Sequence, residues 1–122
     1  MKITKRKRLF KVGVDKKISL KDVGSIKLNN DENITFVDKN SKEYDVCKKN
    51  WGYYATPTIN KRLKNFGYLT GLVHNKELNT FVINIVDIKK KKIFFKYLKK
   101  ENMKLICWLT NKNLKKIKEK FK

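Results

Sequence analysis

The sequence is poor in the residues that build metal centres and disulfide frameworks. Among its 122 residues are one proline, one histidine (His74) and two cysteines, Cys47 and Cys107. A single histidine excludes every metal or catalytic scheme that needs two. Two cysteines so far apart in the chain are interpreted as packed thiols of a reducing compartment, rather than as a disulfide. We expect no metal and no cofactor.

Long apolar runs are also lacking. No stretch approaches the roughly 18 apolar residues that a bilayer-spanning segment needs. The basic start, residues 1–8, is not followed by the apolar region of a signal peptide. There is no internal repeat and no Gly/Ser-rich linker. These absences predict a cytoplasmic chain without a transmembrane segment, and its length predicts one domain over residues 1–122.

Acidic residues are scarce. The chain has 11 Asp+Glu against 32 Lys+Arg, which gives a formal net charge of +21. Such an imbalance repels itself in a compact state, so it is most easily explained if a polyanion usually neutralises it. Codon bias in an AT-rich genome would explain lysine in place of arginine, but not the shortage of carboxylates. Because 40% of the residues are hydrophobic, with seven Phe, five Tyr and two Trp, we expect a folded core with basic edges.

Hydrophobic patterning predicts an α+β fold, mostly antiparallel sheet with two to three helices. Residues 1–8 are expected to form a basic arm, residues 9–109 the folded core, and residues 110–122 a Lys-rich C-terminal helix. Within the core, short strands and turns over residues 9–50 predict a meander of three or four strands. A β-hairpin follows over 68–86, and its second strand, rich in β-branched and aromatic residues, is expected to be central.

Helix signals occur at three places. Thr56 before Pro57 predicts an N-cap with proline at the first helical position, and Gly67 can end that helix. Asp87 is expected to cap a second helix over 88–100. Thr110 or Asn111 is expected to cap the last helix. Periodicity does not decide whether residues 104–109 form a strand or a helical turn.

The candidate polyanion-binding residues are cations at the N-terminus, in the first helix, after Asp87 and in the last helix. They are Lys5, Arg6, Lys7, Arg8, Lys61, Arg62, Lys89, Lys90, Lys91, Lys92, Lys115 and Lys116. Because lysine is a point charge and the chain has only three arginines, binding is expected to be without sequence specificity. The four lysines after Asp87 oppose the helix macrodipole, and a bound anion would offset that cost. A solvated basic surface is the alternative.

The candidate stacking residues are Trp51, Tyr53 and Tyr54, which lie among cations. Such aromatics stack on bases or sugar rings while the charges hold phosphates. Core packing is the alternative, and it is favoured for Trp51. Tyr53 and Tyr54 are adjacent, so in an extended chain they point to opposite sides and one of them is expected to be exposed.

Catalytic signals are weak. The chain has no P-loop, no dinucleotide-binding glycine pattern and no Cys/His metal pattern. Cys47, His74 and Asp45 match no established nucleophile spacing. We expect a protein that is not an enzyme.

The run from Lys49 to Pro57, continued by residues 60–67, resembles a group of small bacterial proteins associated with surface-polysaccharide gene clusters. The resemblance extends from about Leu9 to Leu109, and it implies a setting but no mechanism and no site residues. Our leading hypothesis is a binding protein for RNA or DNA. The alternative is an accessory protein of surface-polysaccharide biosynthesis that binds a partner enzyme, a nucleotide sugar or the anionic membrane face. A homodimer formed through a sheet edge is a third possibility.

Overall fold

The computed structural model describes all of residues 1–122 and divides them into two compact units, Met1–Thr56 and Pro57–Lys122. We call them the N-terminal unit and the C-terminal unit, and each is described by itself. Together they hold eight strands, in three antiparallel sheets, and three α-helices. The expected α+β class with mostly antiparallel sheet is confirmed.

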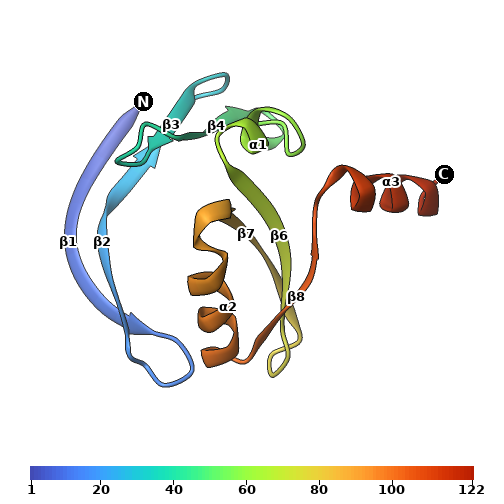
Figure 1. The fold of residues 1–122 in the computed structure, drawn as a ribbon. Helices are drawn as coiled ribbons and strands as arrows, with labels where there is room; N and C mark the ends of the chain where they lie inside the picture. Colours follow the sequence, from blue (N-terminus) through green and yellow to red (C-terminus); the bar gives the residue numbers. More distant parts are fainter. The chain divides into compact units, whose positions relative to one another are not determined.

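The N-terminal unit begins with a long two-stranded hairpin, β1 (Lys2–Val12) and β2 (Ile18–Lys27), visible as a curved ribbon in Figure 1. The basic arm expected over residues 1–8 is therefore wrong, because this segment forms most of β1. Its alternation is interrupted by a register shift between Lys5 and Arg8. That irregularity hides the period-two pattern that identifies a strand in a sequence.

The second sheet of this unit has the order β3-β4-β5, with β3 at Asn33–Val37, β4 at Glu43–Lys49 and β5 at Gly52–Ala55. A single meander over 9–50 is thus wrong, since the β1–β2 hairpin is a sheet of its own. A groove of about 590 Å³ is lined mainly by apolar side chains of both sheets, among them Ile26 and Phe36. No side chain of residues 1–56 is fully buried. The apolar residues of this unit therefore surround an open groove and do not fill a core.

The C-terminal unit contains α1 (Arg62–Asn65), β6 (Tyr68–Asn75), β7 (Thr80–Asp87), the short 3₁₀ helix η1 (Ile88–Lys90), α2 (Lys91–Lys100), β8 (Met103–Trp108) and α3 (Asn111–Lys120). The expected hairpin is confirmed as β6–β7. The central position expected for its second strand is wrong, because the sheet order is β7-β6-β8. Residues 104–109, which periodicity left open, lie mostly in β8 (Met103–Trp108), the strand that pairs with the far side of β6.

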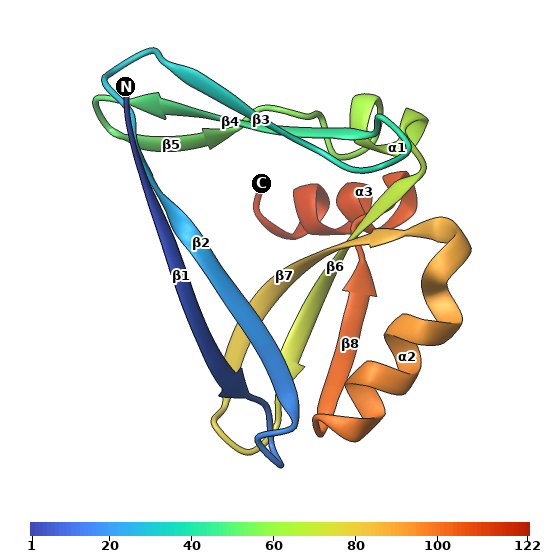
Figure 2. The ribbon, with the colours of Figure 1, turned by 90° about the vertical axis from the view of Figure 1, so that its left-hand side faces the viewer.

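The buried hydrophobic side chains that form the core all lie in the C-terminal unit and are Leu63, Val73, Val86 and Leu98. Helix α2 packs on one face of the β7-β6-β8 sheet, as Figure 2 shows. Its Phe94 ring lies 5.7 Å from the ring of Trp108 on β8. Burial of α2 against the sheet fixes which side of this helix faces solvent.

Local chemistry explains where the helices begin. Asp87 accepts a hydrogen bond from the Lys89 amide at 2.9 Å, and Thr110 caps α3, so both predicted caps are confirmed. The helix expected from Pro57 begins only at Arg62. Thr58 is the reason, because its hydroxyl accepts the Arg62 amide at 2.8 Å and holds residues 58–61 in a turn.

Candidate polyanion-binding surface

Positive charge is concentrated in the C-terminal unit. Residues 57–122 hold 18 Lys+Arg against 4 Asp+Glu, a formal charge of +14, whereas residues 1–56 hold 14 against 7, a charge of +7. Even if every carboxylate of the C-terminal unit paired with a cation, 14 cations would stay unneutralised. The C-terminal unit is therefore the part of the chain that attracts anions most strongly.

Helix α2 arranges part of this charge in a line. With about 100° per residue, Phe94 and Leu98 point to the sheet, and the opposite side carries four exposed lysines. We call these the lysine stripe: Lys92, Lys96, Lys99 and Lys100. The stripe is about 12 Å long at 1.5 Å per residue. The first turn of α2 contains no acidic residue that would interrupt it.

The four lysines expected to bind anions after Asp87 divide into two kinds. Lys89 and Lys90 lie in η1 and are exposed, and Lys92 begins the lysine stripe. Lys91 is half-buried, and its Nζ lies 5.8 Å from the centre of the Trp108 ring, in a cation–π contact. Lys91 is thus partly engaged within the fold, whereas the other three are open to solvent.

The candidate cations of α1 and α3 are exposed as well. Lys61 and Arg62 lie at the start of α1, and Lys115 and Lys116 lie on α3. A hydrogen bond of 2.7 Å from the Asn60 side chain to that of Asn111 joins the turn before α1 to the first residue of α3. The structure therefore brings the start of α1 and the start of α3 together.

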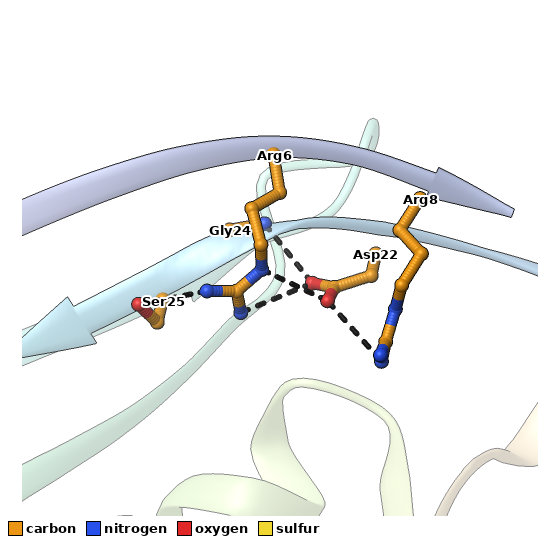
Figure 3. A network of polar contacts seen from close by, with 5 residues as sticks. All are labelled: Arg6, Arg8, Asp22, Gly24 and Ser25. Atoms are coloured by element: carbon orange, nitrogen blue, oxygen red, sulfur yellow. Dashed lines mark hydrogen bonds and ion pairs between the residues drawn. The ribbon is translucent and has the colours of Figure 1, made fainter.

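The N-terminal unit binds two of its candidate cations internally, around Asp22 (Figure 3). Arg6 meets Asp22 with two nitrogens, at 2.9 and 3.3 Å, and its third nitrogen lies 3.3 Å from the Ser25 hydroxyl. Arg8 approaches the same carboxylate at 3.4 Å, and the Gly24 amide donates to it at 3.2 Å. The hydrogen bond from Arg6 is the main reason that the pKa of Asp22 lies below its ordinary value. Arg6 is thereby occupied, which leaves Lys5 and Lys7 as the exposed lysines of this part of β1.

The three candidate stacking residues are exposed. Trp51 lies in the turn between β4 and β5 and is 66% exposed, so the core packing favoured for it is wrong. Tyr53 pairs with Lys48 across the sheet and is 68% exposed, and Tyr54 pairs with Cys47 and is 50% exposed. As neighbours in a strand, the two tyrosines lie on different faces of the sheet. Lys48 Nζ lies 5.4 Å from the centre of the Tyr53 ring. At least one of the two tyrosines was expected to be exposed, and in the structure both are, because neither ring is packed into a core.

Three members of the lysine stripe, Lys96, Lys99 and Lys100, were missed by the sequence interpretation. The signal that identifies them is the spacing 92, 96, 99 and 100 within the predicted helix, since residues three or four positions apart share one side of a helix. The continuous run 89–92 is more conspicuous in the sequence, yet it winds around the helix start. The periodic lysines form the linear array.

The residue types that bind metals form no cluster. No group of three His, Cys, Asp or Glu side chains is placed to hold a metal ion. The His74 ring packs against Phe81 and its Nε2 lies 2.9 Å from the Asn79 side-chain oxygen. Both cysteines are free thiols and half-buried.

None of the helices has the length and hydropathy required to cross a bilayer. No protein-family model, curated protein or solved structure matches this chain.

Proposed function

We propose that this protein binds RNA or DNA without sequence specificity, mainly through the C-terminal unit. The observation that carries the proposal is the excess of 18 cations over 4 carboxylates in residues 57–122, part of it aligned as the lysine stripe on α2. A linear row of positive charges suits the phosphate backbone of a nucleic acid, whose negative charges are also arranged in a line. Binding is favourable because the lysines release the counterions that are condensed on the nucleic acid.

The kind of cation supports binding without sequence specificity. Arg62 is the one arginine of the C-terminal unit, and the lysine stripe contains none. Arginine forms the bidentate contacts that read guanine, whereas a lysine ammonium contacts phosphates as a point charge. The proposed complex is therefore held by the backbone of the nucleic acid and not by its base edges.

The proposal is tested with nuclease-treated protein and fluorescently labelled oligonucleotides of equal length. Single-stranded RNA, single-stranded DNA and duplex DNA are each titrated in two unrelated sequences at about 50 mM salt. We expect binding of nucleic acid, with dissociation constants that differ little between the two sequences of one type. Absence of binding to every oligonucleotide would refute the proposal, and a strong preference for one sequence would refute its non-specific character.

A second candidate is favoured by the exposed aromatic segment of the N-terminal unit. Trp51, Tyr53 and Tyr54 present their rings beside Lys48, which suits a nucleotide sugar as well as a nucleic acid. This is the accessory role in surface-polysaccharide biosynthesis that the sequence resemblance implies. A deletion strain with altered surface glycans would support it, and normal glycans would count against it.

A further inference from the structure

Helix α3 is attached to the C-terminal unit at its beginning but not along its length. Thr110 caps it, the Asn113 side chain donates to the Trp108 carbonyl at 2.7 Å, and Asn111 accepts from Asn60. None of its residues is buried. In Figure 1 the helix extends away from the β7-β6-β8 sheet. A ten-residue helix with so few tertiary contacts is only marginally stable in water, so it gains much from a surface that covers it.

One side of α3 is apolar and partly exposed. The half-buried Leu114, Ile117 and the C-cap residue Phe121 follow one another at intervals of three and four residues and therefore lie toward one side of the helix. Ile117 is 41% exposed and Phe121 is 83% exposed. We call these three residues the α3 strip. A benzyl and a butyl side chain left in water form an apolar edge that a partner can remove from solvent.

Lysines border the α3 strip on both sides. With about 100° per residue, Lys116 and Lys120 lie on one side of it, and Lys115 and Lys118 lie on the other. Lys112 completes the charged surface, and Glu119, on the side away from the strip, is the only acidic residue of the helix. Lysine stems extend along an apolar surface while their ammonium groups stay in water. A narrow apolar strip between two rows of lysine is the pattern of a helix that lies flat in a membrane interface.

We propose that α3 binds the surface of an anionic lipid bilayer, with its strip among the acyl chains and its lysines at the headgroups. Charge complementarity favours an anionic bilayer over a second copy of this chain, because two copies of α3 packed together would place lysines against lysines. Nucleic acid would engage the lysines but would leave the exposed aliphatic side chain of Ile117 in water. The proposal goes beyond nucleic-acid binding and does not rest on it, since it depends on the apolar side chains of a different helix.

The experiment compares the wild-type chain with a variant that carries Ile117→Ser and Phe121→Ser, which leaves the charge unchanged. Each protein is sedimented with sucrose-loaded vesicles of phosphatidylglycerol and phosphatidylcholine in equal parts, and with vesicles of phosphatidylcholine alone. We expect the wild type to bind the anionic vesicles at least about tenfold more tightly than the neutral ones. The strip variant is expected to lose at least about tenfold in binding to the anionic vesicles, because each apolar side chain adds to partitioning. Its affinity for a labelled oligonucleotide is expected to stay within about twofold, because its lysines are intact.

Equal binding of wild type and strip variant to anionic vesicles would overturn the proposal, since the lysines alone would then hold the membrane. Absence of vesicle binding by the wild type would overturn it too, and would favour a protein as the occupant of α3. A lowered melting temperature of the strip variant would mean that the strip is covered within the protein, which also contradicts the proposal. The single variant Phe121→Ser provides a check that does not depend on folding, because this side chain is 83% exposed. Oligonucleotide binding, measured on the same samples, separates failure of this proposal from failure of the proposed function.

Discussion

Replacing three of the four lysines of the lysine stripe tests whether their position or only the total charge of the chain governs nucleic-acid binding. The variant carries Lys92→Gln, Lys96→Gln and Lys99→Gln. The stripe is about 12 Å long, and one strand of duplex DNA presents a phosphate every 3.4 Å or so along the axis, so three contacts fit along it. Each lost phosphate contact makes the slope of log K against log salt shallower by about 0.9 for duplex DNA and about 0.7 for a single strand. We expect a change of slope of about 2 to 3.

The same relation gives the loss of affinity. If a phosphate contact adds no affinity at about 1 M salt, it strengthens binding by nearly a factor of ten at about 0.1 M salt. Loss of three contacts should therefore raise the dissociation constant by on the order of 10²–10³ at about 0.1 M salt. Glutamine and lysine have similar helix propensities, so α2 should keep its stability. The assay is fluorescence anisotropy of a labelled oligonucleotide over a salt series, with a thermal melt of each protein as the folding control.

A matched control removes three exposed lysines from the β1–β2 hairpin: Lys11→Gln, Lys21→Gln and Lys27→Gln. Both variants lower the formal charge by the same amount. The account predicts a much larger loss of affinity for the stripe variant than for the hairpin variant. Equal losses would refute the reasoning, because total charge would then govern binding. An unchanged slope in the stripe variant would show that phosphates bind elsewhere.

Three further predictions concern the fold that holds these surfaces. Leu98→Ala should destabilise the C-terminal unit by about 2–5 kcal/mol in urea denaturation, because this side chain of α2 is buried, and a cost under 1 kcal/mol would contradict that packing. Gly24→Ala should make the chain far more sensitive to limited proteolysis than Gly52→Ala, because it loosens the β1–β2 hairpin. Both glycines have positive φ, but only at Gly24 would a Cβ meet a facing carbonyl oxygen, that of Thr4, at 2.2 Å. Equal sensitivity of the two variants would contradict this. Asp22→Asn should lower the melting temperature at neutral pH, because the ionised carboxylate of Asp22 stabilises the fold. Arg6 lowers the pKa of Asp22 in the folded protein. This stabilisation is therefore complete above the pKa of about 3.9 in the unfolded chain, and it is lost as the pH falls through the lower pKa of the folded protein. The melting temperatures of wild type and Asp22→Asn should therefore converge as the pH falls below the unfolded value, and a pH-independent difference would contradict the role of this carboxylate.

Much of the C-terminal unit could be predicted from the sequence because its signals are local. The 68–86 hairpin, the Asp87 cap, the Thr110 cap and the positive φ of Gly67 each depend on a few neighbouring residues. The position of β7 could not be predicted in this way. Its β-branched residues suit a central strand, yet β8 pairs with β6, and that pairing is decided by contacts distant in the sequence.

The N-terminal unit deviated from expectation for related reasons. Residues 2–8 are mostly charged and have low strand propensity, but pairing with β2 makes them a strand. Aromatic residues such as Trp51 were expected in a core, whereas this unit encloses an open groove and leaves Trp51 exposed. For the candidate site, the sequence identified the sign and abundance of charge. The spacing of the lysines at 92, 96, 99 and 100 is present in the sequence, and the packing of Leu98 and Phe94 in the structure shows that these lysines lie on the solvent side of α2.

The central claim is that unneutralised cations of this chain bind nucleic acid, and its most direct test is the salt dependence of wild-type binding. Anisotropy of labelled RNA and DNA oligonucleotides is measured with nuclease-treated protein from about 50 to 300 mM salt. The account predicts binding whose log–log slope is steeper than about −3, which corresponds to several neutralised phosphates at about 0.7–0.9 per contact. No binding at the lowest salt, or a slope near zero, would contradict the claim and would leave the net charge of +21 without a role in nucleic-acid binding.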